Sequence, residues 1–187
     1  TRGLFKFNAL LFENYNANSG LSEDEVTAIY PLQNGDLVIA NPLSFNILNT
    51  SVNKYNIQKA NQFNVRILDV AEDVENNQLL FATNDGGLMI YSANNFQSPL
   101  QIIKSPQSRF TTVEVFNGAV YVAGDAGIWK KEGKAFTTIL DLESTRNLGV
   151  LGDQLGIFTI FDGVYTYDGK ELRHFTSNII DLNNVYD

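Results

Sequence analysis

One pattern recurs about every 40 residues along this chain. Each copy has an apolar run, a turn rich in Asn and Gly, a second apolar run, and a third run that usually follows a glycine. The turn falls at Asn34, Asn76, Asn117 and Gly152, which gives steps of 42, 41 and 35 residues. No helical periodicity interrupts the copies. A period of this length without helices predicts stacked units of four strands each.

The strands of one copy differ in polarity. The second runs, at 37–40, 79–82, 119–123 and 155–159, are largely apolar on both faces, whereas the third and fourth mix in polar residues. Hairpins between the third and fourth strands are expected at 91–96, 131–136 and 167–170. This gradient is typical of small sheets that stack face to face around an axis, because the inner strands are covered and the rim is wet.

The predicted fold is therefore an all-β β-propeller. A two-sheet sandwich also has many short strands, but it gives no reason for a repeated four-strand signature. The inner strands should carry the most buried side chains, which we expect to be Leu37, Ile39, Leu80, Ala82, Val120, Val122 and Ile157.

The copies divide the 187 residues into one propeller segment. Four fairly complete blades are expected at about 21–60, 61–108, 109–143 and 144–178, with partial blades at 1–20 and 179–187. We expect the segment to belong to a larger propeller that continues on both sides. Uncovered terminal blade faces would favour a homodimer through the propeller faces or marginal stability.

Composition excludes several classes of function. The net charge of −8 is spread along the chain without a Lys/Arg cluster, which disfavours nucleic acid and anionic membrane surfaces as partners. Cysteine is absent, so thiolate metal sites and cysteine nucleophiles are excluded. No apolar stretch approaches the roughly 18 residues that span a bilayer. We expect no cofactor and no direct membrane contact in this segment.

The candidate ligand residues are Asn84, Asp85, Asp125 and Asp162, which occupy equivalent turns between the second and third strands. These turns should line one end of the propeller, where a polar ligand could bind. A pair of such carboxylates could serve glycoside hydrolysis, although Asp beside Gly is also what a tight turn requires. Acidic residues at successive turns predict an electronegative rim and hence a neutral or cationic ligand.

Evidence for catalysis is weak in the sequence. His174 is the only histidine and has no metal-site or triad partner at a suitable spacing. Aromatic residues at or near equivalent third-strand positions, Phe7, Tyr91, Trp129 and Tyr167, could stack on sugar rings or simply pack between blades. The sequence therefore predicts a protein that is not an enzyme.

Two of the copies resemble a known family. Gly20–Tyr30 with Asn34–Ala40, and the segment from Asp69 to Tyr91, resemble the two-component regulator propeller repeat, GLxxNxVxxIxxDxxGxLWIGTxxGL. The copies at 109–143 and 144–178 share only its hydrophobic pattern and glycine. The chain departs from the repeat where the second strand normally carries tryptophan, because it has Val38, Leu80, Tyr121 and Ile157.

The resemblance carries functional expectations. In that family such repeats form the periplasmic sensor region of hybrid two-component regulators of Bacteroidetes-type bacteria, commonly linked to polysaccharide sensing. It implies a non-catalytic sensor in the periplasm or cell envelope, with an oligosaccharide or a protein as partner. The alternatives are a propeller component of type IX secretion or another envelope scaffold, and a carboxylate-dependent propeller glycosidase or lyase.

Overall fold

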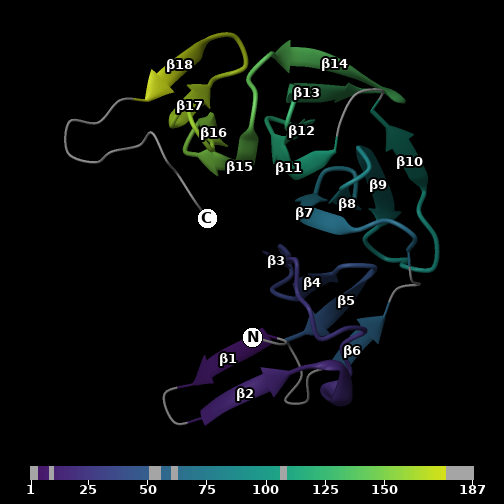
Figure 1. Ribbon diagram of the computed structural model, residues 1–187. Helices are drawn as coiled ribbons and strands as arrows, with labels where there is room; N and C mark the ends of the chain where they lie inside the picture. The colour runs from purple at the N-terminus through teal and green to yellow at the C-terminus, as the bar shows by residue number, and fades with distance from the viewer. Residues whose placement is uncertain (1–3, 9–10, 51–55, 60–62, 106–108, 176–187) are drawn as a thin grey trace.

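The structure is a computed structural model that describes residues 4–8, 11–50, 56–59, 63–105 and 109–175. Its described part is all-β, apart from one 3-10 turn at Ala17–Ser19. Four four-stranded antiparallel sheets follow one another along an arc, preceded by a two-stranded hairpin (Figure 1). This arrangement confirms the predicted blades of a propeller. The expected partial blade at 179–187 lies outside the described residues.

We call the four sheets blades I to IV. Blade I contains β3 (Ala28–Pro31), β4 (Leu37–Asn41), β5 (Ser44–Asn49) and β6 (Asn56–Lys59). Blade II contains β7 (Ile67–Asp73), β8 (Gln78–Thr83), β9 (Gly87–Ser92) and β10 (Gln101–Lys104). Blade III contains β11 (Phe110–Phe116), β12 (Ala119–Gly124), β13 (Gly127–Glu132) and β14 (Ala135–Leu140). Blade IV contains β15 (Thr145–Leu151), β16 (Gln154–Thr159), β17 (Val164–Tyr167) and β18 (Leu172–Phe175). The hairpin that precedes them pairs β1 (Leu4–Asn8) with β2 (Leu11–Tyr15).

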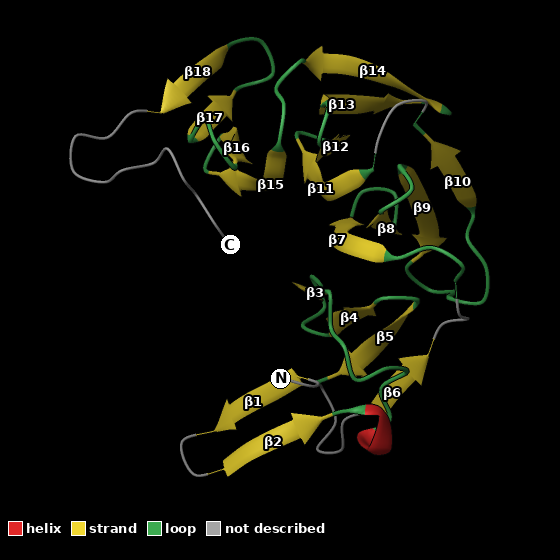
Figure 2. Cartoon of the chain, in the orientation of Figure 1, coloured by secondary structure: helices red, strands yellow, loops and turns green. Residues whose placement is uncertain are grey.

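Every blade pairs its strands in chain order, from the inside of the arc outwards. The first strands, β3, β7, β11 and β15, line the inside, and β6, β10, β14 and β18 lie on the outside (Figure 2). The turn between β11 and β12 shows why the sequence has Asn-Gly there. Asn117 and Gly118 adopt φ angles of 50° and 70°, the left-handed conformation that a two-residue hairpin turn requires.

Apolar side chains fill the spaces between successive blades. Separate clusters join blade I to II, blade II to III and blade III to IV. Of the side chains predicted to be most buried, all are buried except Leu37. Leu37 is half-buried because it begins β4, at the margin of a smaller cluster with Tyr15 and Leu21.

One outer hairpin differs from the prediction. The chain turns after β9 near the expected place, where Ser92 and Asn95 form an isolated bridge. The outer strand β10 nevertheless begins only at Gln101, so residues 93–100 form a longer connection. His174 lies on the outer strand β18 as expected, exposed, with its Nε2 3.0 Å from the carbonyl oxygen of Asp162. Within the described part, no helix has the length and apolar character needed to cross a membrane.

Candidate functional site

Three inner strands share an irregularity at the same place. β7, β11 and β15 each carry a β-bulge near their start, at Leu68, Thr111 and Arg146 respectively. A bulge redirects the side chain of its extra residue and is common beside binding sites. Here all three bulge residues line one pocket.

The pocket has a volume of about 480 Å³ and is mainly polar. It is lined by residues at the beginnings of the inner strands of all four blades. These strands lie on the inside of the arc (Figure 1). Its lining residues are Val26, Thr27, Ala28, Ile29, Arg66, Leu68, Asp69, Arg109, Thr111, Arg146 and Asn147. The Thr27 hydroxyl is buried and makes no hydrogen bond with any described residue. We call this space the inner pocket.

A chain of hydrogen bonds between blades holds the inner pocket together. Asp69, Thr112 and Asn147 occupy equivalent positions on β7, β11 and β15. The Thr112 hydroxyl donates to Asp69 Oδ2 (2.7 Å) and lies 3.1 Å from Asn147 Oδ1. Two backbone N–H groups add further hydrogen bonds between the same strands. Val113 N donates to Asp69 Oδ2 (3.0 Å), and Leu148 N donates to Thr112 Oγ1 (3.2 Å). Buried polar groups satisfied in this way fix the register between blades.

Three guanidinium groups and the carboxylate of Asp69 give the inner pocket its charged groups. Arg66 forms a salt bridge with Glu25, and Arg109 forms one with Asp125 at 3.1 Å. Arg146 is exposed and forms no salt bridge with the described residues. The arginines that do have partners are about half exposed, so these ion pairs contribute little to stability and can exchange partners.

Two of the predicted ligand residues adjoin the inner pocket. Asn84 Oδ1 accepts a hydrogen bond from Arg66 N (3.1 Å), and the Asp125 carboxylate pairs with Arg109. Both therefore contact a lining residue, although neither lines the pocket itself. Their role as ligand residues stays a prediction.

The other two predicted residues lie elsewhere in their turns. The Asp85 carboxylate pairs with Lys104 on the outer strand β10 and accepts hydrogen bonds from Thr83 Oγ1 (2.7 Å) and Gly87 N (3.2 Å). Burial opposes its ionisation, but the hydrogen bonds from Lys104 and Thr83 outweigh burial and hold the pKa of Asp85 below its usual value. Asp162 is exposed, and its backbone N–H is bound by Thr159 Oγ1 (2.9 Å). Neither Asp85 nor Asp162 lines the inner pocket, and their role as ligand residues stays a prediction.

The charged groups at this end of the propeller are of both signs. Asp85 and Asp125 are each paired with a cation, Arg146 forms no salt bridge with a described residue, and the Asp69 carboxylate lines the same pocket. The expected electronegative rim stays a prediction. Sequence reasoning missed the arginines because it compared turns and apolar runs. The available signal was an arginine just before the first strand in two successive copies, Arg66 and Arg109.

One partly buried carboxylate with a raised pKa, Glu114, lies outside the inner pocket. Burial raises the pKa of Glu114, its hydrogen bond from Val115 N opposes this, and the charge of Asp69 adds to the increase. Glu114 is not among the lining residues of the inner pocket, so it does not form an acid and base pair there. Among the described residues, no group of three or more His, Asp or Glu side chains is placed to hold a metal ion.

Comparison with solved structures identifies the architecture. The extracellular domain of the hybrid two-component system BT3049 from B. thetaiotaomicron superimposes with a TM-score of 0.74 at 17% identity, over 98% of this chain. The fold is a β-propeller. The extracellular domain of BT4673, from a hybrid two-component system of the same organism, matches with a TM-score of 0.66 at 14% identity over 84% of the chain. The WD40 propeller domain of Doa1 matches with a TM-score of 0.66 at 10% identity over 82%.

The extent of these matches limits what they imply. The chain spans 26% of the BT3049 domain, 24% of the BT4673 domain and 54% of the Doa1 domain. No family model and no curated protein sequence matches the chain. At these identities the likeness shows the propeller fold alone.

Proposed function

We propose that this propeller is a non-catalytic recognition module, the extracytoplasmic ligand-sensing part of a two-component regulator that responds to glycans. The observation that carries the proposal is the inner pocket, where four blades contribute equivalent strand beginnings to one polar cavity. The resemblance of two copies to the regulator repeat supports it. So does the structural likeness to extracellular domains of two hybrid two-component systems.

The chemistry of the inner pocket favours an acidic sugar over a neutral one. Arg146 offers a guanidinium without an ion-pair partner among the described residues, beside the amide of Asn147. A guanidinium binds a carboxylate through two parallel hydrogen bonds, which a neutral hydroxyl cannot match. We therefore expect a uronate-containing oligosaccharide as the ligand, instead of the neutral or cationic ligand that the net charge and the acidic turns suggested. Asn84 and Asp125 would act indirectly, by positioning Arg66 and Arg109.

Calorimetric titration tests the proposal with a pair of matched oligosaccharides, one carrying a uronate and one its neutral counterpart. The uronate should bind more tightly, and Arg146→Gln should remove most of the difference. Arg173→Gln is the matched control, because Arg173 is exposed on β18 and pairs with Glu171. It removes the same charge far from the inner pocket and should leave binding unchanged.

Two outcomes would contradict this proposal. Equal loss of binding in Arg146→Gln and Arg173→Gln would mean that only net charge matters. Turnover of the oligosaccharide that is lost in an Asp85→Asn, Asp125→Asn double variant would favour the glycosidase or lyase instead.

An envelope scaffold is the second candidate function. The observation that favours it is an apolar hollow of about 370 Å³ on blade IV, which no described residue covers. Exposed Leu151 and Phe175 line it. Such a face suits a protein partner or a second copy of the chain. Concentration-dependent sedimentation of the wild type and of Phe175→Asp would separate this candidate from a sensor that stays monomeric.

A further inference from the structure

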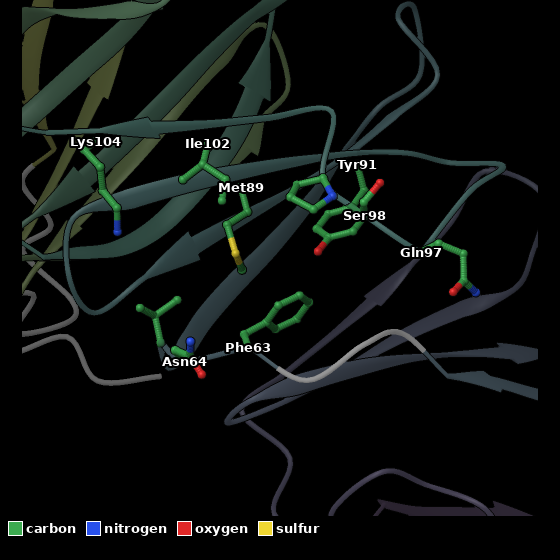
Figure 3. A pocket seen from close by; sticks show the side chains of 10 residues that line it. Phe63, Asn64, Met89, Tyr91, Gln97, Ser98, Ile102 and Lys104 are labelled. Atoms are coloured by element: carbon green, nitrogen blue, oxygen red, sulfur yellow. The ribbon is translucent and has the colours of Figure 1, made fainter.

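A second pocket lies on the outer side of blade II, away from the inner pocket. It has a volume of about 400 Å³ and is mainly apolar. Side chains of β9 and β10 line it together with residues 63–65, and the long connection 93–100 contributes Gln97, Ser98 and Pro99. Figure 3 shows how the labelled side chains lie around it. We call it the outer pocket. Its apolar walls are Phe63, Val65, Met89, Tyr91, Pro99 and Ile102.

Tyr91 is the feature that distinguishes the outer pocket from an ordinary packing defect. The residue is only 1% exposed, and its ring packs edge-on against Phe63, with centroids 5.9 Å apart. No hydrogen bond of its hydroxyl to a described residue is found, and this oxygen is not one of the fully buried polar atoms that lack a partner, so it reaches the space of the outer pocket. Figure 3 shows the phenol oxygen on the side of the ring that faces Met89 and Phe63. A hydrogen-bonding group thus points into an apolar space.

The protonation of this hydroxyl is fixed. Burial raises the pKa of Tyr91 to about 12, so the phenol keeps its proton throughout the physiological range. It is therefore available as a hydrogen-bond donor to an acceptor on a ligand.

The mouth of the outer pocket adds polar groups without an unbalanced charge. Gln97 and Ser98 lie there, and the Lys104 ammonium is paired with Asp85. A charged ligand would have to leave water without an opposite charge to meet, which is unfavourable. A sugar would bury several hydroxyl groups against Phe63, Met89 and Ile102, which offer no hydrogen-bond partners, and this is also unfavourable.

We propose that the outer pocket binds a small, neutral aromatic molecule with one hydrogen-bond acceptor, its ring between Phe63 and Met89 and its acceptor on the Tyr91 hydroxyl. Aromatic rings and a thioether favour such a ring through stacking and sulfur contacts. The volume accommodates a substituted benzene. The site and the ligand class are separate from those of the proposed glycan sensor, so either can fail without the other.

Ligand-observed NMR titration of the 187-residue chain tests the proposal with two probes of nearly the same shape. Acetophenone carries a carbonyl acceptor, and α-methylstyrene has a methylene group in its place. Both should bind the wild type. In Tyr91→Phe, which keeps the ring, acetophenone should lose about two- to tenfold in affinity relative to α-methylstyrene.

Variants at the mouth locate the binding. Ile102 is 52% exposed and lines the outer pocket, so Ile102→Lys should fold and should abolish binding of both probes. Leu100 is 62% exposed on the same segment but does not line it, so Leu100→Lys is the matched control and should bind as the wild type does. A thermal melt of each variant confirms folding.

Three results would overturn the proposal. These are absence of binding by the folded wild type, binding that survives Ile102→Lys, and an affinity ratio of the two probes that is unchanged in Tyr91→Phe.

Discussion

Blades II and IV have the same strand order, but they differ on one face, the one that in blade II packs against blade III. In blade II, Leu80 and Ile90 pair across β8 and β9 and pack against blade III. The equivalent pair in blade IV is Gly156 and Thr166. Blade III covers Leu80 completely, whereas no described residue covers the hollow lined by Leu151 and Phe175 in blade IV. The two blades therefore share their strand pairing and differ in whether a described neighbour packs on this face.

The largest expected effect comes from deleting the side chain that fills blade II. Leu80→Ala should lower the free energy of unfolding by about 2–5 kcal/mol, because it opens a cavity between two blades. Leu151→Ala removes the same atoms from the open face of blade IV, where Leu151 is 47% exposed, and should change stability by less than about 1 kcal/mol. Urea denaturation measures both. Equal losses would mean that the two faces are packed alike.

The hydrogen-bond chain on the inner strands predicts a smaller difference. Asp69→Ala leaves the Val113 N–H group without its acceptor and removes one of the two acceptors of the Thr112 hydroxyl, so it should cost about 1–3 kcal/mol. Asn147→Ala, the equivalent change in blade IV, leaves the link from Leu148 N to Thr112 intact and should cost less. The same denaturation series checks the order. If Asn147→Ala is the more harmful change, the chain of hydrogen bonds does not run as described.

Glu114 allows a pH test of how well the blade interface excludes water. Burial raises the pKa of Glu114 in the folded protein above the ordinary carboxyl pKa of 4.5. The contribution of Glu114 to stability is therefore most favourable below pH 4.5 and is lost as the pH rises through the raised pKa. Glu114→Gln should therefore stabilise the protein near neutral pH, by less than about 1 kcal/mol since water still screens the group. The gain should vanish in acid. Asp153→Asn, at an exposed turn of blade IV, is the matched control for the loss of one carboxylate.

The smallest expected effect concerns the turn carboxylates. Asp85→Asn in blade II removes the ion pair with Lys104 and should cost less than about 1 kcal/mol, because the pair is largely exposed. The lowered pKa of Asp85 means that this contribution is present above the ordinary carboxyl pKa and is lost as pH falls through the lowered one. Asp162→Asn, at the equivalent turn of blade IV, should be neutral. Thermal melts at neutral and acidic pH measure the stability of both variants. A larger loss of stability in Asp162→Asn than in Asp85→Asn would contradict this prediction.

Much of the fold could be predicted because its signals are local. Asn-Gly at 117–118 specifies a tight turn by itself, and apolar runs such as 79–82 identify buried strands wherever they lie. The inner pocket could not be predicted in the same way. Arg66 and Arg109 occupy equivalent positions, but Arg146 stands two residues later, at a bulge that changes which side chain faces the pocket. Their convergence depends on how the blades are stacked, which no spacing in the sequence encodes.

The outer connections differ in length far more than the inner ones do. Eight residues, 93–100, join β9 to β10 in blade II, whereas two residues, Gly133 and Lys134, join β13 to β14 in blade III. The longer connection supplies Gln97, Ser98 and Pro99 to the outer pocket. An insertion or deletion at this edge can therefore create or remove a binding site without moving any inner strand. For protein engineering, the outer hairpins of blades III and IV are positions where a second pocket could be grafted by changing loop length alone.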